Sequence, residues 1–474
     1  MPTPVSQPQV NADQLRAILA KQQSAYLSQG IPGLAQRRAN LDKLLALLKE
    51  NEQAIVEAIS KDFGNRAHQE TRLAEMFLCI DGIKYARKKL SQWMRPQKRS
   101  VSLWFFGARN TVIPQPLGVV GIVVPWNYPL FLCISPLIGA IAAGNRCMIK
   151  MAANSSNLSQ LLHQLFAQTF TEDMLTIVLN AKGSEFSALP FDHLIFTGSG
   201  NTGRQVMRAA ADNLTPVTLE LGGKSPTIIA PDFPIKKAAE RLLFSKCLNA
   251  GQTCVAPDYL FLPVDKVEEF IAAAQTIVSG RYPDINSNDY TSIIDERVYK
   301  RLISTLAEAV DHGATAIPMI ANSVANDVSR KFPPTLLTGV NEDMRVMQEE
   351  VFGPILPIMT YTHMHEVLDY INAHDRPLAL YLFSNDKALQ TDVISKTRSG
   401  GVCLNDTTLH VGQHDMPFGG IGESGMGQYH GEEGFMAMSK LRPIFKQARN
   451  PAAGRLYPPY GKQFDTIIKF MLRG

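Results

Sequence analysis

The strongest constraint on the fold is an alternation of apolar runs and helical segments between residues 118 and 223. The apolar runs read GVVGIVVPW at 118–126, CMIKM at 147–151, LTIVLN at 175–180, HLIFTGSG at 193–200 and PVTLELGG at 216–223. The segments between them that have helical spacing are 129–143, 156–169 and 202–213. Runs that are apolar on both faces need a layer of helices on each side. The pattern therefore predicts an α/β fold built on a parallel sheet.

A second alternating region begins near Ser225. Its predicted helices lie at 234–248, 264–278, 296–312 and 385–397, and its predicted strands lie near 257–262, 335–339, 354–361 and 401–404. A chain of 474 residues exceeds one ordinary core, so two or three domains are expected. We place the seam between the two regions at Leu221-Gly222-Gly223, because paired glycines permit the close backbone approach that an inter-domain crevice requires.

The remaining segments have other patterns. Residues 1–10 are rich in Pro and Gln and are predicted to be disordered, whereas residues 12–95 show largely helical spacing. Short aromatic and β-branched runs at 99–116 indicate a β-hairpin, or a pair of strands, that leaves the main body. The apolar stretch at 464–472 is short and carries two charges, so it predicts a packed terminal element and not a membrane anchor.

Composition excludes several classes of partner. The net charge is only +4, and no stretch combines dense Lys and Arg with aromatic residues, so nucleic acid is not an expected partner. The six cysteines form no CxxC pair and no metal-ligand spacing, which fits a reducing cytoplasm and predicts no metal site. The N-terminus lacks the order of a signal peptide, and no run approaches the roughly 20 apolar residues of a membrane helix. We therefore expect a cytoplasmic protein without a membrane span.

The segment Asn249-Ala250-Gly251-Gln252-Thr253-Cys254 carries a candidate nucleophile. A thiol can attack an aldehyde carbonyl to give a thiohemiacetal, provided that its pKa falls or that a base lies close by. The alternative is that Cys254 is a small core residue, as free cysteines often are. Cys247, two helical turns earlier, is predicted to be a packing residue.

Glu220 and Asn127 each follow an apolar strand, and each has an alternative role. Glu220 ends the strand before Gly222, so its carboxylate would face the crevice and could act as a general base. It could instead cap a helix or form a salt bridge. The side-chain amide of Asn127, in Pro125-Trp126-Asn127-Tyr128-Pro129, could donate to an oxyanion, or could simply stabilise a turn.

A glycine-rich turn, Thr197-Gly198-Ser199-Gly200-Asn201-Thr202-Gly203, joins a predicted strand to a predicted helix. Gly198, Gly200 and Gly203 match the GxGxxG pattern, and the N–H groups of such a turn suit a pyrophosphate. Glu220 lies near the distance expected of a ribose-binding acid, which gives it a second possible role. However, the turn follows the fourth strand of the region and not the first, so the usual context of the pattern is absent.

Taken together, these segments resemble the aldehyde dehydrogenase superfamily from about residue 40 to residue 445. The resemblance makes Cys254 the nucleophile, Glu220 the general base and Asn127 the oxyanion donor. In QEEVFGPILPI it places Glu350 on the nicotinamide ribose and Phe352 beside the ring, with NAD or NADP as the cofactor. The cofactor-binding residues that it implies are Pro125, Trp126, Lys150, Gly198, Ser199, Gly203, Leu221, Gly222, Glu350 and Phe352.

The resemblance also implies a domain organisation. A Rossmann-like parallel-sheet cofactor domain is joined to an α/β catalytic domain and to a β-strand oligomerisation arm. The expected boundaries are 11–98 and 117–221 for the dinucleotide-binding domain, 222–409 for the catalytic domain, 99–116 and 438–460 for the arm, and 410–437 for a closing segment. An exposed sheet edge tends to pair with another chain, so a homodimer or homotetramer is expected.

Finer features concern the substrate. NLTPVTLELGGKSP and SGMGQYHG resemble the class 3 branch of the superfamily, and RCMIKM resembles the coniferyl aldehyde dehydrogenases within that branch. The implied reaction is oxidation of an aromatic aldehyde, such as coniferyl aldehyde, or of a medium- or long-chain aliphatic aldehyde to its acid. Tyr128, His410, His414 and Phe418 could line the substrate entrance, or could be ordinary packing residues. A CoA-acylating relative and a non-catalytic protein on the same scaffold are the alternatives.

One segment departs from the family pattern. Members often carry Lys-Pro-Ser-Glu after the second strand, where this chain has Lys150-Met151-Ala152-Ala153. Loss of the carboxylate at position 153 removes a ribose contact and also the repulsion that would exclude a 2′-phosphate. With Lys150 nearby, we expect NADP to be accepted alongside NAD.

Overall fold

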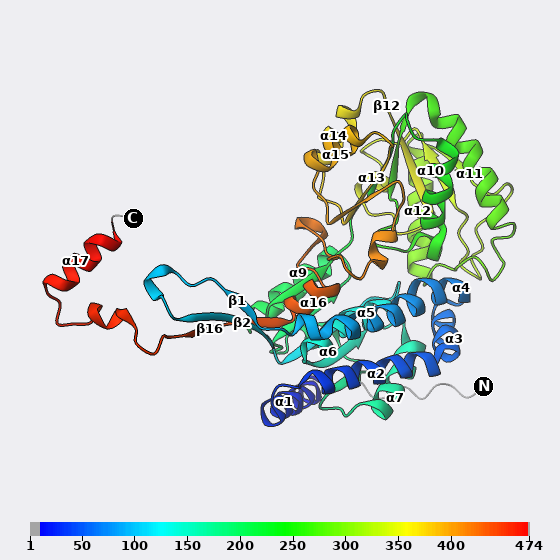
Figure 1. Ribbon diagram of the computed structural model, residues 1–474. Helices are drawn as coiled ribbons and strands as arrows, with labels where there is room; N and C mark the ends of the chain where they lie inside the picture. Colours follow the sequence, from blue (N-terminus) through cyan, green and yellow to red (C-terminus); the bar gives the residue numbers. More distant parts are fainter. Residues whose placement is uncertain (1–9, 473–474) are drawn as a thin grey trace.

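The computed structural model describes residues 10–472, so residues 1–9 of the segment predicted to be disordered lie outside the described range. The chain forms two α/β bodies, each built around one sheet, and an arm that projects from the first body (Figure 1). The prediction of an α/β fold with parallel sheets covered by helices is confirmed.

The first body contains a six-stranded sheet with the order β15-β7-β6-β3-β4-β5. Its strands are β3 (Val119–Val124), β4 (Arg146–Met151), β5 (Leu175–Val178), β6 (His193–Thr197), β7 (Val217–Glu220) and β15 (Gly425–Met426). All neighbours pair in parallel except β15, which runs antiparallel to β7. The first five strands are those that the alternating pattern predicted.

Helices cover both faces of this sheet. They are α1 (Ala12–Gln29), α2 (Leu34–Glu50), α3 (Glu52–Phe63), α4 (His68–Thr71), the π-helical turn η1 (Arg72–Phe77), α5 (Leu78–Trp93), α6 (Phe131–Ala143), α7 (Ser156–Thr169), α8 (Gly183–Ser187), α9 (Gly200–Ala211) and α16 (Gly431–Ala437). Helix α6 is buried all round except at Ser135, because it lies between strands β3 and β4 and helices α2 and α5. This sandwiched position explains its uniformly apolar sequence.

The second body contains a seven-stranded sheet with the order β10-β11-β12-β9-β8-β13-β14. Its strands are β8 (Pro226–Ile229), β9 (Tyr259–Pro263), β10 (Thr315–Pro318), β11 (Thr335–Thr338), β12 (Ile355–Tyr361), β13 (Ala379–Phe383) and β14 (Gly401–Leu404). Its helices are α10 (Ile235–Cys247), α11 (Val267–Arg281), α12 (Glu296–Asp311), α13 (Arg345–Gln348), α14 (Met364–Ala373) and α15 (Lys387–Lys396). The sequence analysis missed β10, α13, β13 and α14.

The arm is a three-stranded antiparallel sheet made of β1 (Gln97–Arg99), β2 (Arg109–Pro116) and β16 (Ser439–Lys446). It continues into helix α17 (Lys462–Met471), which extends away from both bodies (Figure 1). The prediction that the 464–472 stretch is a packed terminal element is wrong, because α17 buries none of its residues against the described chain. Its Phe470 ring lies 6.0 Å from the ring of Trp104, between β1 and β2 of the arm. Within residues 10–472 no helix is long and apolar enough to cross a membrane.

The strand order of the first sheet indicates where a ligand would bind. The chain passes from β3 outward through β4 and β5, then returns to the other side of β3 with β6 and β7. Such a reversal leaves a crevice beyond the carboxyl ends of the two strands that flank it. Strand β3 leads there into Pro125-Trp126-Asn127, and β6 leads into Gly198-Ser199. Both candidate segments therefore lie at the reversal point.

Gly144 allows a test of the packing around α6, with Gly280 of α11 as the control. Gly144 ends α6 with a φ of 92°, and a Cβ there would lie 2.8 Å from Cζ of the buried Arg37. Gly144→Ala should lower the free energy of unfolding by about 2 kcal/mol, measured by urea denaturation. The control is Gly280→Ala in α11, where an added Cβ would meet no atom within 4 Å. It should stabilise the protein by about 0.5 kcal/mol, and equal effects of the two changes would contradict this description.

Candidate active site

The loop before Cys254 has an unusual backbone. Helix α10 ends at Cys247, and the next turn places Asn249, Ala250 and Gly251 in succession at φ values of 54°, 50° and 73°. Gly251 is required there, because a Cβ would lie 2.4 Å from the carbonyl oxygen of Gly353. Three left-handed residues in succession turn the chain sharply after α10. The turn brings Cys254, which is only partly exposed, to the wall of an apolar cavity.

The thiol of Cys254 is protonated at neutral pH in this environment. Burial raises its pKa to about 12, and the nearby carboxylates of Glu350 and Glu220 act in the same direction. The backbone N–H groups of Cys254 and Val255 oppose the shift but do not cancel it. Nucleophilic attack therefore requires a group that accepts the thiol proton.

Glu220 is placed to be that group. It ends β7, is 2% exposed, and lies close enough to Cys254 for its charge to raise the pKa of the thiol. Neither carboxylate oxygen has a hydrogen-bond partner among residues 10–472. Burial raises the pKa of this carboxyl group well above its ordinary value, which makes it a stronger base near neutral pH. Its placement matches neither a cap nor a salt bridge within the described chain.

Asn127 joins the strand β3 side of the crevice to the nucleophile loop. Its buried side-chain Nδ2 donates to the carbonyl oxygen of Gln252 at 3.3 Å. Next to it, the Tyr128 hydroxyl lies 2.9 Å from Oγ1 of Thr253, the residue before Cys254. The candidate oxyanion donor and the candidate nucleophile are thus connected across 125 positions of sequence.

The cavity at Cys254 has a volume of about 320 Å³ and a mostly apolar wall. Tyr128 and Phe418 line it, as the sequence analysis expected. So do Tyr429 of the SGMGQYHG segment and side chains that no sequence motif singled out: Phe77, Phe131, Leu132, Phe244 and Leu409. They come from helices and loops far apart in the chain, so no local motif could have grouped them.

The two histidines expected at the entrance lie elsewhere. His410 does not line the cavity, since its ring lies against Gly401 and near the rings of Tyr381 and Phe418. His414 faces α5, where its Nε2 lies 3.3 Å from a carboxylate oxygen of Asp81. We therefore assign neither His410 nor His414 to the substrate entrance. Within the described chain no group of His, Cys, Asp and Glu residues could hold a metal ion.

A second, more polar cleft of about 720 Å³ lies between the two bodies. Its walls include Ser199, Gly200, Gly222 and Glu350. A Cβ at position 222 would lie 2.1 Å from a carboxylate oxygen of Glu350, so the glycine allows this carboxylate to approach the backbone. Burial and the nearby Asp258 raise the pKa of Glu350 to about 8. The cleft thus combines a helix N-terminus, a glycine approach and a carboxylate, the groups that hold a dinucleotide.

The other expected cofactor residues support this cleft or lie beside it. Gly203 leaves room for Leu221, because a Cβ there would lie 2.6 Å from the Leu221 side chain, and Gly198 does the same for the ring of Phe196. Trp126, after Pro125, packs edge to face on Phe352 with ring centroids 5.4 Å apart. Lys150 does not line the cleft, and its Nζ donates to the carbonyl oxygen of Met151 at 3.2 Å.

Comparison with known proteins identifies the class. The model of the aldehyde dehydrogenase family matches residues 4–444. A probable coniferyl aldehyde dehydrogenase of Pseudomonas aeruginosa is 51% identical over 98% of this chain and 97% of its own length. A coniferyl aldehyde dehydrogenase of Pseudomonas sp. HR199 is 42% identical over 98% of this chain and 97% of its own. The chain belongs to the aldehyde dehydrogenase family, and the prediction of an NAD(P)-dependent aldehyde-oxidising enzyme is confirmed.

Solved structures give the same answer for the fold. The substrate-bound AldH of Staphylococcus aureus superposes with a TM-score of 0.90 at 35% identity, covering 96% of this chain and 99% of that one. A Mycobacterium tuberculosis aldehyde dehydrogenase complexed with NAD+ gives a TM-score of 0.84 at 26% identity, covering 94% and 92% of the two chains. The expected aldehyde dehydrogenase fold is confirmed.

The burial of Glu220 predicts a pH-dependent effect on stability. A carboxyl group whose folded-state pKa lies above its ordinary 4.5 destabilises the folded state progressively as the pH rises above 4.5. Glu220→Gln removes this effect, so it should raise the free energy of unfolding at pH 8 by at least about 1 kcal/mol, and by less at pH 5. The exposed Glu240, changed to Gln, is the control and should show no such pH dependence. Urea titrations at both pH values measure the difference, and equal effects of the two variants would contradict the burial argument.

Proposed function

We propose that the enzyme oxidises an aldehyde to its carboxylic acid through a thioester on Cys254. Glu220 accepts the thiol proton, and the thiolate sulfur attacks the carbonyl carbon to form a thiohemiacetal. Asn127 and the backbone N–H of Cys254 donate to the oxygen, which carries the negative charge. A bound NAD or NADP supplies the hydride acceptor for the conversion to a thioester. Glu220 next loses the thiol proton to solvent and takes a proton from water, whose oxygen attacks the thioester. The carboxylic acid leaves, and the proton on Glu220 passes to the sulfur to form the thiol again.

One observation supports this proposal above the others. Glu220, a buried carboxyl group without a partner among residues 10–472, lies near enough to the partly exposed thiol of Cys254 to raise its pKa, and Cys254 lines the apolar cavity. A structural protein on the same scaffold would have no use for a carboxyl group buried without a partner, since such burial is unfavourable. A CoA-acylating enzyme would not need a base that activates water. Glu220 therefore favours hydrolysis as the final step.

The cofactor assignment follows the walls of the cleft. Ser199, Gly222 and Glu350 line the cleft. The ring of Phe352 packs against the ring of Trp126. Glu350 would hold the nicotinamide ribose, and the N-terminus of α9 would receive the pyrophosphate. At the carboxyl end of β4, Lys150 is half-buried while Ala153 is exposed, so an extra phosphate would meet a cation and no carboxylate. NADP is then accepted beside NAD.

The apolar wall of the cavity favours an aromatic substrate. Tyr128, Phe131 and Phe418 present rings to a ligand at Cys254, and rings of a conjugated aldehyde can stack on them. The relatives from two Pseudomonas strains carry the name coniferyl aldehyde dehydrogenase, which agrees with this chemistry. A medium- or long-chain aliphatic aldehyde is the second candidate, because the same wall also accepts an alkyl chain.

We further assign the enzyme to the cytoplasm and to a homodimer or homotetramer. All six cysteines are unpaired, as expected of a reducing compartment. The arm at 99–116 and 438–460 would pair with a second copy, since its sheet leaves apolar side chains such as Phe445 exposed. The cofactor domain would comprise 11–98 and 117–221, the catalytic domain 222–409, and the closing segment 410–437.

Replacing the nucleophile tests the reaction. Cys254→Ala should reduce NADH formation from coniferyl aldehyde on the order of 10³-fold or more, because no other thiol is placed to form the thioester. The matched control is Cys247→Ala, a buried core thiol that should keep most of the activity. Glu220→Gln should slow both the formation of the acyl adduct on Cys254 and its hydrolysis, which intact-mass measurements over time follow. Activity that survives Cys254→Ala would refute the proposal.

The cofactor preference has its own test. Ala153→Glu restores a carboxylate near Lys150, so it should shift the ratio of kcat/KM toward NAD by about tenfold, equivalent to about 1.4 kcal/mol. Steady-state assays with both cofactors measure the ratio. A wild-type preference for NAD above roughly a hundredfold would contradict the proposed acceptance of NADP.

A further inference from the structure

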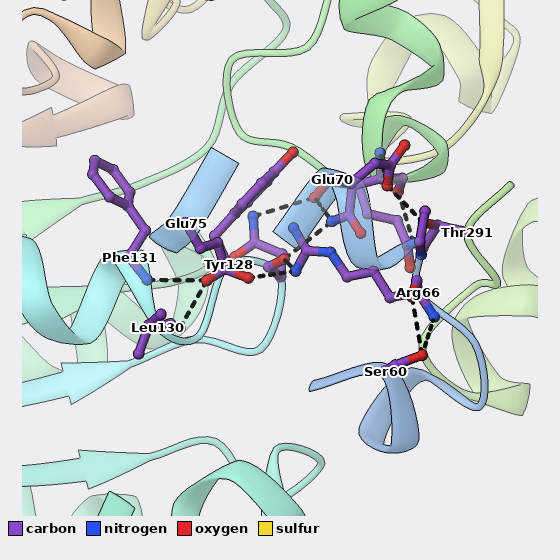
Figure 2. Close-up of polar contacts among 12 residues, drawn as sticks. Ser60, Arg66, Glu70, Glu75, Tyr128, Leu130, Phe131 and Thr291 are labelled. Atoms are coloured by element: carbon purple, nitrogen blue, oxygen red, sulfur yellow. Dashed lines mark hydrogen bonds and ion pairs between the residues drawn. The ribbon is translucent and has the colours of Figure 1, made fainter. Parts of the chain in front are cut away.

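We propose that Arg66, Glu70 and Glu75, three buried charged residues between α3 and α5, position the oxyanion donor Asn127 against the Cys254 loop (Figure 2). The inference rests on the proposed function and extends it to residues that touch neither aldehyde nor cofactor. None of the three belongs to a motif identified in the sequence. They are positioning residues, and they act through the backbone around Asn127.

Arg66 is the first part of this frame. Its side chain is completely buried, and its Nη1 donates both to Oε1 of Glu75 at 2.7 Å and to the carbonyl oxygen of Asn127 at 3.0 Å. The guanidinium carbon lies 4.7 Å from the ring centroid of Tyr128 and 5.2 Å from that of Phe63. Arg66 therefore restrains the backbone of Asn127 and the ring of the next residue together.

Glu75 holds the other end of the same segment. Its Oε2 accepts hydrogen bonds from the N–H groups of Leu130 at 2.8 Å and Phe131 at 2.9 Å, at the N-terminus of α6 (Figure 2). A carboxylate there accepts from N–H groups that have no acceptor within the helix, and its negative charge interacts favourably with the positive end of the helix dipole. The Arg66–Glu75 pair thus connects to both sides of the turn that carries Asn127 and Tyr128.

Glu70 fixes the nucleophile loop from the same side. Its Oε2 accepts from the hydroxyl of Thr291 at 2.6 Å and from the N–H of Asn249 at 3.1 Å. The side chain of Asn249 donates in turn to the carbonyl oxygens of Asn127 at 3.0 Å and Gln252 at 3.1 Å. Asn249 begins the left-handed turn, so Glu70 stabilises a backbone conformation that is otherwise unfavourable.

The energetics favour a positioning role over a purely structural one. A buried ion pair is rarely more stabilising than apolar side chains of similar volume. Nε and Nη2 of Arg66 have no partner within residues 10–472, which makes the pair still less favourable for stability. The charged groups instead fix geometry, because each of their hydrogen bonds ends on a specific atom of the Asn127 turn or of the loop before Cys254.

The test removes the pair without leaving a lone charge. Arg66→Met combined with Glu75→Gln keeps the volume, and the glutamine oxygen still accepts from Leu130 and Phe131. We expect a folded enzyme whose KM for NAD is unchanged. Its kcat, and the rate constant of the acylation burst, should fall about 10- to 100-fold. The matched control is Arg146→Met with Asp173→Asn, an ion pair at the amino end of β4, and it should leave kcat unchanged. An unchanged kcat in the Arg66/Glu75 double variant would overturn the proposal.

A double-mutant cycle with Asn127→Ala shows whether the pair acts through Asn127. If it does, the Arg66/Glu75 change should reduce kcat much less in the Asn127→Ala background than in the wild type. A full reduction in both backgrounds would overturn the assignment. A second measurement tests the positioning role independently of the proposed function. The rate at which iodoacetamide alkylates Cys254 depends on the geometry of the loop and requires no turnover. Glu70→Ala should change that rate, Glu70→Gln should restore it, and an unchanged rate in Glu70→Ala would overturn the role of Glu70.

Discussion

One backbone atom, the carbonyl oxygen of Asn127, joins three segments of the candidate active site. Two side chains donate to it, Nη1 of Arg66 and Nδ2 of Asn249, from 61 and 122 positions away in the sequence. A buried carbonyl must be satisfied, so the segments that satisfy it cannot move independently. Through this atom the segment between α3 and α5, the turn after β3 and the loop before Cys254 are connected, which supports the proposed roles of Cys254 and Asn127.

Burial gives the site its acid–base character. The groups Cys254, Glu220 and Glu350 all have raised pKa values, and burial is the largest cause for each. Burial therefore disfavours the thiolate of Cys254 and the carboxylates of Glu220 and Glu350 alike. The same burial makes the apolar cavity suitable for a hydrophobic aldehyde. One physical condition therefore serves both the chemistry and the selection of the substrate.

The arm follows a different principle from the two bodies. Its strands come from distant parts of the chain, and its aromatic contacts, Phe105 with Phe445 and Trp104 with Phe470, lie largely at the surface. Pairing of β2 with β16 satisfies the backbone but buries few apolar side chains. Such a sheet gains little stability within one chain. This supports the proposal that a second copy covers it.

The sequence by itself determined five strands of the first sheet, all but β15, most helices of both bodies, and the segments that carry Cys254, Glu220 and Asn127. It could do so because apolar periodicity and glycine turns are local signals. Tertiary structure alone decided which residues surround them. Phe77 and Phe244 line the cavity, His410 does not, and Arg66, Glu70 and Glu75 lie behind the turn that carries Asn127. Packing between distant segments sets these contacts, and no short window of sequence contains them.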